Sequence, residues 1–192
     1  MSKQKPSLDR LLQGLPAAAK AHPVHSWHPE CCGVIDIRID AQGCWYHDGE
    51  PIRRPALVKL FASILRRDSD GFYLVTPAEK QRIAVEDAPL WVNRLRHEGQ
   101  GEQQRVLLIT QTDDRVPLDD EHPLWVHNSA DAPAPYVRVR DRLDARIGRN
   151  VFYQLVALAV SRQQDGEAQF GVWSCGRFFR LDADTGAGGA GG

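Results

Sequence analysis

The sequence predicts an α+β fold built from two small, mostly antiparallel domains, each with the element order β-β-α-β-β. Residues 52–71 and 147–166 align at an offset of 95 positions, and seven of the twenty pairs are identical. Each aligned segment carries apolar residues at helical spacing, and segments that alternate apolar and polar residues flank both. We interpret this agreement as a duplication. The alternative is a chance similarity between two amphipathic helices.

In the first unit, residues 34–39 alternate apolar and polar residues, residues 40–43 form a turn, and residues 44–46 begin the returning strand. Pro55 suits the first turn of a helix. One apolar helix face follows, and further strands are expected at 72–75 and 81–85. The predicted face consists of Leu57, Leu60, Phe61, Ile64 and Leu65.

The second unit repeats this order with strands at 136–140 and 143–147 and a hairpin of 170–173 with 177–180. Its helix face is Phe152, Leu155, Val156, Ala159 and Val160. Between the units, residues 105–110 read as a strand. The sequence Leu-Trp-Val also occurs twice, at 90–92 and at 124–126. The tryptophans of these segments are expected in a core or an interface, or stacked on a flat ligand.

These elements divide the chain into four parts. Residues 1–33 form a lead-in with a short helix capped by Ser7, and residues 34–97 form the first domain. Residues 98–184 form the second domain, because the polar, glycine-containing segment 93–104 is typical of a boundary. Residues 185–192 contain mostly Gly and Ala and are expected to be disordered.

Composition narrows the class of protein. The 192 residues are 42% hydrophobic and 26% charged, which is typical of a globular chain. The net charge of −1 argues against a protein that binds nucleic acid through its overall field. The apolar runs are too short to cross a membrane. With four cysteines, two of them adjacent, we expect reduced thiols, a cytoplasmic location and no membrane partner.

Arginine provides the main site prediction, because the chain has 19 Arg and only 5 Lys. Arg53 and Arg54 precede the first helix and Arg149 precedes the second, where free backbone N–H groups favour an anion. Arg138 and Arg140, with Tyr136, lie on the adjacent strand. The alternative is that Arg138 and Arg140 form a solvated face paired with Asp141 and Asp144.

A second candidate is the turn at 76–80. Thr76, Glu79 and Lys80 bring a hydroxyl, a carboxylate and an ammonium group together, which suits a loop that orients a ligand. The alternative is an ordinary solvated hairpin loop. The sequence does not decide between these two interpretations.

Other motifs do not support a cofactor or a catalytic residue. His22, His25, His28, Cys31 and Cys32 have zinc-like residue types, but Pro23 and Pro29 break the helix that this spacing requires. Cys175 lacks a neighbouring base and suits a tight turn. No phosphate-binding glycine loop is present. We therefore expect no metal and no cofactor. An enzyme is a third hypothesis, which the sequence favours less; a deep pocket that holds carboxylates with raised pKa, such as Glu79 or Glu86, would support it.

Many short motifs follow one known family in order. They are Ile35-Asp36-Ile37, Gly43-Cys44-Trp45, Pro51-Ile52-Arg53-Arg54, Asp70-Gly71-Phe72-Tyr73-Leu74-Val75-Thr76-Pro77, Tyr136-Val137-Arg138-Val139-Arg140 and Trp173-Ser174-Cys175-Gly176-Arg177. Together they resemble the uncharacterised bacterial family labelled domain of unknown function 1285, from about Trp27 to Leu181. The resemblance implies a duplicated two-domain fold with a pleckstrin-homology-like C-terminal domain. It also implies a site between the domains for a nucleotide-like ligand, and a signalling role.

These observations lead to two functional hypotheses. The first is a non-enzymatic ligand-binding or sensory protein that holds an anionic, nucleotide-like molecule at the domain interface. The second is a protein-interaction adaptor that binds its partner along an exposed sheet edge.

Overall fold

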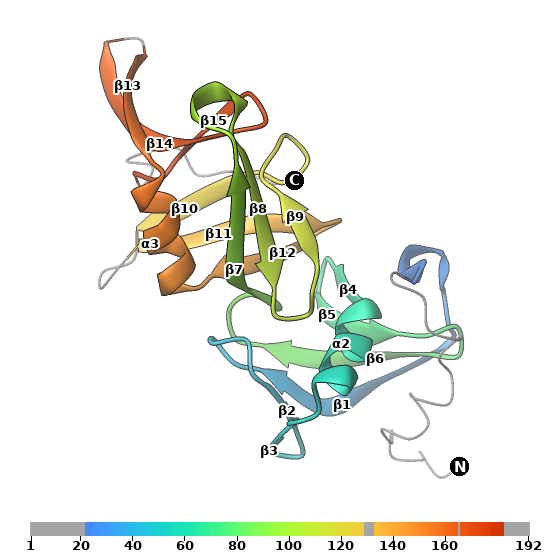
Figure 1. Cartoon of the computed structure of the whole chain (residues 1–192). Helices are drawn as coiled ribbons and strands as arrows, with labels where there is room; N and C mark the ends of the chain where they lie inside the picture. The colour runs from blue at the N-terminus through green and yellow to red at the C-terminus, as the bar shows by residue number, and fades with distance from the viewer. Residues whose placement is uncertain (1–21, 129–132, 165, 183–192) are drawn as a thin grey trace, which may run out of the picture. The chain divides into compact units, whose positions relative to one another are not determined.

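The computed structural model describes residues 22–128, 133–164 and 166–182 (Figure 1). The predicted N-terminal helix and the Gly/Ala tail lie outside these residues. The chain divides into two compact units, residues 1–89 and 90–192. The boundary expected at 97/98 therefore falls inside the second unit, because residues 93–98 continue a strand that begins at Leu90.

Unit 1 forms one six-stranded sheet in the order β3-β2-β1-β6-β5-β4. Only β1 and β6 pair in parallel; the other neighbours are antiparallel. Its elements are η1 (Val24–Ser26), β1 (Cys31–Ile39), β2 (Trp45–His47), β3 (Glu50–Pro51), α2 (Pro55–Ser63), β4 (Leu65–Asp68), β5 (Gly71–Val75) and β6 (Glu79–Val85).

The core of unit 1 lies between the sheet and α2. Alternate residues of β1, Ile35, Ile37 and Ile39, are buried, as the alternating pattern predicts. Phe61 and Ile64 are fully buried at the end of α2. Pro55 occupies the first helical turn, so the predicted start of the helix is confirmed.

Unit 2 contains a six-stranded sheet in the order β10-β11-β12-β7-β8-β9 and a three-stranded sheet β13-β14-β15. Here β12 and β7 form the parallel pair. The elements are β7 (Leu90–Glu98), η2 (Gly101–Gln103), β8 (Arg105–Thr110), β9 (Arg115–Pro117), β10 (Leu124–Asn128), β11 (Pro133–Arg140), β12 (Leu143–Ile147), α3 (Arg149–Ala157), β13 (Val160–Gln164), β14 (Glu167–Ser174) and β15 (Arg177–Arg180).

The structure confirms the α+β class and the two mostly antiparallel domains. The repeated order also appears, since α2 and α3 are each followed by three strands. Each helix is therefore followed by one strand more than predicted, and unit 1 also has the short strand β3 before its helix. The extra strands, β4 and β13, begin at Leu65 and Val160, which the sequence pattern had assigned to the helix faces. The likeness of unit 2 to a pleckstrin-homology fold stays a prediction.

In the part of the chain that the structure describes, no helix is both long and apolar enough to cross a bilayer.

Candidate functional site

A row of four side chains crosses the six-stranded sheet of unit 2. Trp125 pairs with Tyr136, Tyr136 pairs with Arg146, and Arg146 pairs with Trp91, on β10, β11, β12 and β7. Directly paired residues point to the same face of a sheet. All four are half-buried, whereas their strand neighbours such as Val137 are buried on the opposite face. We call these four residues the aromatic row.

The aromatic row is fixed by contacts between its members. The rings of Trp125 and Tyr136 stack with centroids 5.9 Å apart and planes inclined by 16°. Arg146 donates from Nη1 to the Tyr136 hydroxyl at 3.0 Å, and its guanidinium carbon lies 5.2 Å from the ring centroid. His127 accepts a hydrogen bond from Trp125 Nε1 at 3.1 Å. The row is therefore a preorganised flat surface that includes one cation.

At one end of the row, Trp91 lines an open pocket of about 220 Å³ at the start of α3. Gly148, Arg149 and Asn150 are also in the lining. Gly148 is the N-cap and offers no side-chain cap. The first backbone N–H groups of a helix have no partner within it, so they face this pocket as donors. A Cβ at Gly148 would lie 3.0 Å from Trp91 Nε1, which explains a glycine here.

The pocket favours a small anion. The helix terminus carries partial positive charge, and Arg149 adds a full one. Arg149 is exposed, and no carboxylate among the described residues pairs with it. A volume of about 220 Å³ is enough for a phosphate or carboxylate group with some water.

Arg138 and Arg140 are held by carboxylates instead. Arg138 forms an ion pair with Asp144 and also donates to the Asp141 carbonyl at 3.2 Å. Arg140 forms an ion pair with Asp114, which follows β8. The Arg138 contacts match the alternative of a strand face paired with Asp141 and Asp144, whereas Arg140 has a partner that the alternative did not name. Of the predicted residues in unit 2, Arg149 lines the pocket and Tyr136 belongs to the aromatic row.

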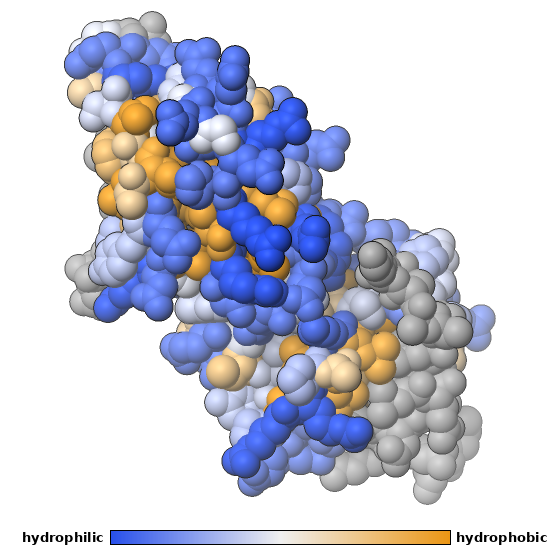
Figure 2. Space-filling view, in the orientation of Figure 1, coloured by the Kyte–Doolittle hydropathy of each residue, from blue (hydrophilic) through white to orange (hydrophobic). Residues whose placement is uncertain are grey.

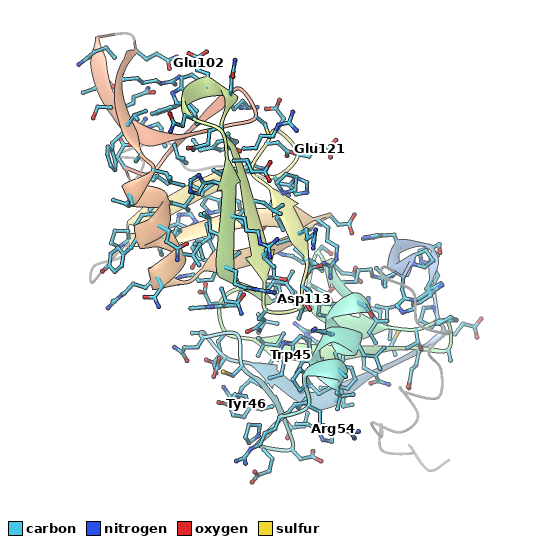
Figure 3. The ribbon with its side chains drawn as sticks, viewed as in Figure 1. Trp45, Tyr46, Arg54, Glu102, Asp113 and Glu121 are labelled. Carbon is cyan, nitrogen blue, oxygen red and sulfur yellow. The ribbon has the colours of Figure 1, made fainter. Side chains whose placement is uncertain are left out.

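The predicted residues of unit 1 do not converge in the same way. Arg53 and Arg54 are exposed, and Arg54 is the N-cap of α2 (Figure 3). Thr76 is fully buried, and its hydroxyl accepts hydrogen bonds from the backbone of Ala78 and Glu79, which closes the turn. That hydroxyl therefore has a structural role in the hairpin.

Glu79 and Lys80 point to opposite faces of β6, as adjacent strand residues must. Lys80 Nζ lies 2.5 Å from Asp68 and 3.8 Å from the Tyr73 ring centroid. Glu79 is only 3% exposed and accepts from Gln81 Nε2 at 2.8 Å, while its second oxygen has no partner. The loop at 76–80 therefore does not present its hydroxyl, carboxylate and ammonium groups together.

The remaining sequence candidates are Cys175 and the possible metal ligands. Cys175 has a positive φ of 52° and, with Gly176, forms the turn between β14 and β15. Among the described residues, no three His, Cys, Asp or Glu side chains are placed to hold a metal ion.

Sequence reasoning missed Asn150 and His127 as site residues. One available signal was the repeated Leu-Trp-Val segment, which marks strands β7 and β10. Placing Trp91 and Trp125 on one row also required the strand register, which the repeat does not contain.

The fold and the pocket define a two-domain α+β protein with an open pocket at the start of α3 in its second domain. The family model described as domain of unknown function (DUF1285), N-terminal domain, matches residues 22–88, and its C-terminal counterpart matches residues 89–181. The chain belongs to this family.

Two solved structures are similar to the chain. A DUF1285 family protein from Silicibacter pomeroyi DSS-3 is 43% identical, with a TM-score of 0.79, and the match covers 89% of this chain and 93% of that one. A DUF1285 family protein from Shewanella baltica OS155 is 26% identical, with a TM-score of 0.48, covering 62% and 87%. A search among curated proteins found no match.

Proposed function

We propose that the protein binds a small anionic ligand at the start of α3 and acts as a sensor rather than an enzyme. The observation that carries this proposal is the pocket formed by Trp91, Arg149, Asn150 and the free N–H groups of the helix. It combines a helix terminus, an exposed guanidinium and an indole ring, which suit an anion attached to a planar group.

The pocket supports binding rather than catalysis. Its lining consists of Trp91, Val92, Asn93, Gly148, Arg149, Asn150 and Val151. None of these side chains is a general base or a nucleophile of the kind that hydrolases and transferases use. The ligand in this proposal is nucleotide-like: its anionic group occupies the pocket, and its ring lies outside against the aromatic row. We also propose a cytoplasmic location, because four cysteines, two of them adjacent, are few for a secreted protein stabilised by disulfides.

Titration calorimetry of the full chain with inorganic phosphate and with adenosine monophosphate tests this proposal. Arg149→Gln should weaken binding of both probes about tenfold, the order expected for losing one charge-assisted hydrogen bond. Arg53→Gln removes the same charge from unit 1 and should leave affinity within about twofold. If neither probe binds, or if both variants bind equally well, the pocket is not the site.

A second candidate function is an adaptor that takes an extended partner segment along β13. This strand is at the edge of its sheet, and four of its five residues are exposed. Val160 is 44% exposed, and the adjacent β14 carries Phe170 at 36%. Exposed strand edges with apolar side chains are common sites of strand addition.

Hydrogen exchange with a purified partner would test the adaptor. Partner binding should slow exchange of the β13 amides, and Val160→Lys should abolish that protection, because a charge on the edge opposes strand addition. Gln164→Lys adds the same charge at the far end of β13 and should have less effect. Unchanged exchange in β13 in the presence of a bound partner would exclude this edge.

A further inference from the structure

Three arginines without a partner among the described residues lie on neighbouring strands of unit 2. Most described arginines contact a carboxylate, a carbonyl or an aromatic ring, as Arg66 and Arg180 do. Six have no such partner among the described residues. These six are Arg53, Arg54, Arg96, Arg105, Arg115 and Arg149. Three of them lie on the consecutive strands β7, β8 and β9.

Strand register places these three side chains on the same face. Arg94 pairs with Ile109, which pairs with Arg115. Two residues along, Arg96 pairs with Leu107, which pairs with Pro117. Glu98 pairs with Arg105 in the same register. We call this surface the arginine face; it consists of Arg94, Arg96, Glu98, Arg105, Leu107, Ile109, Arg115 and Pro117. Figure 2 shows deep-blue side chains over β7, β8 and β9 with orange ones between them.

Few local carboxylates neutralise the arginine face. Asp113, in the loop after β8 (Figure 3), lies 2.5 Å from Arg94 Nη2. Its neighbour Asp114 pairs with Arg140 instead. Glu98 lies opposite Arg105 in the register but forms no ion pair with it in the described structure. The face therefore carries more positive than negative charge, although the whole chain has a net charge of −1.

We propose that the arginine face binds an acidic segment of a partner protein. Guanidinium groups pair with carboxylates through two parallel hydrogen bonds. Residues two apart on β7 are about 7 Å apart, which matches the spacing of alternate carboxylates on an extended peptide. Half-buried Leu107 and Pro117 lie between the charges and fit apolar side chains of such a segment.

Fluorescence anisotropy with the full chain tests the proposal. The probe is a short labelled peptide in which Glu alternates with Ser, and the control peptide has Gln at every Glu position. The double variant Arg96→Gln/Arg115→Gln should weaken binding of the acidic peptide roughly tenfold, the order expected for losing two exposed ion pairs. The matched control, Arg53→Gln/Arg54→Gln, removes the same charge from two other unpaired, exposed arginines and should change affinity less than about twofold.

Each other outcome would overturn the proposal. Equal losses in both double variants would mean that net charge alone attracts the peptide. Equal binding of the Gln peptide would mean that carboxylates are not recognised. Tighter binding of a single-stranded oligonucleotide, or of vesicles containing phosphatidylserine, would assign the face to a nucleic acid or to a lipid surface. Because Arg149 is unchanged in both double variants, failure here leaves the phosphate-binding test of α3 unaffected.

Discussion

Replacing Asp68 with Asn should release the segment around η1 from the sheet of unit 1. Arg66, which is 8% exposed, donates from Nε and Nη2 to the two Asp68 oxygens at 2.9 and 3.1 Å. Its Nη1 donates to the carbonyls of Val24 and Trp27, each at 2.9 Å. Asp68 therefore fixes the guanidinium that holds the lead-in segment against β4. It also lies 2.5 Å from Lys80.

The expected cost is about 2–3 kcal/mol of unfolding free energy. Breaking a buried ion pair by removing one partner costs about 3–5 kcal/mol. The Asp68 side chain is 25% exposed, so solvent recovers part of that energy, and Asn still accepts one hydrogen bond. The expected loss is a large fraction of the total of about 5–15 kcal/mol that stabilises a typical domain.

The effect should depend on pH in a defined direction. Burial acts to raise the pKa of Asp68, but hydrogen bonds from Lys80 and Arg66 outweigh it and hold the pKa below its ordinary value of 3.8. A lowered folded-state pKa gives stability that is complete above the unfolded pKa and is lost as pH falls through the folded one. The difference between wild type and Asp68→Asn should thus be constant from about pH 7 to about pH 5 and shrink below the ordinary pKa.

Urea unfolding with hydrogen exchange provides the assay, because exchange separates the two units. Asp68→Asn should speed exchange in residues 22–28 and in β4. Asp182→Asn is the matched control: it removes a carboxylate that pairs with Arg180 at 2.9 Å in unit 2, and it should leave that exchange unchanged. Unchanged protection at 22–28 in Asp68→Asn, or a stability difference that persists at the lowest pH, would refute the reasoning.

Three further results are expected. Gly171→Ala should destabilise unit 2 by more than about 2 kcal/mol, because a Cβ there overlaps the Phe179 carbonyl oxygen. Gly33→Ala is the control, because a Cβ at Gly33 meets only the movable Gln81 amide. Urea unfolding of the two variants compares their stabilities. Glu79→Gln should raise the free energy of unfolding, measured by urea titration, by about 1 kcal/mol, since it replaces a buried carboxylate that has an unpartnered oxygen. The hydrogen bond from the Tyr46 hydroxyl to Asp40 raises the pKa of Tyr46, so Asp40→Asn should lower that pKa. Ultraviolet titration measures the pKa of Tyr46, with Tyr46→Phe as the reference.

Sequence patterns located the helices well but extended their C-terminal ends too far along the chain. The apolar residues Ile64 and Leu65 continue the helical spacing, yet α2 ends at Ser63 and Leu65 begins β4. Both residues are buried, so the period alone does not separate a last helical turn from a first strand residue. β4 was missed because Arg66, Arg67 and Asp68 look like a solvated loop, and its stability depends on pairing with β5.

The candidate site depended on contacts between distant residues. Asp114 lies 26 positions from its partner Arg140, a separation that no local pattern reveals. The anion prediction at helix starts needed only local information, so Arg149 was found at the pocket, whereas the aromatic row required the pairing of four strands. Arg96, Arg105 and Arg115 were likewise unremarkable until the register placed them on one face.

The parallel pairing of β7 with β12 has a consequence for synthesis on the ribosome. β7 is the first strand of unit 2, and its neighbour β12 begins only at Leu143. At about 5–20 residues per second, β7 leaves the ribosome roughly 3–10 seconds before β12. During that interval the backbone edge of β7 around Leu90 and Val92 has no strand beside it, while unit 1 already has its complete sequence. Newly made chains should therefore be most prone to aggregation, and to capture by chaperones, in this window.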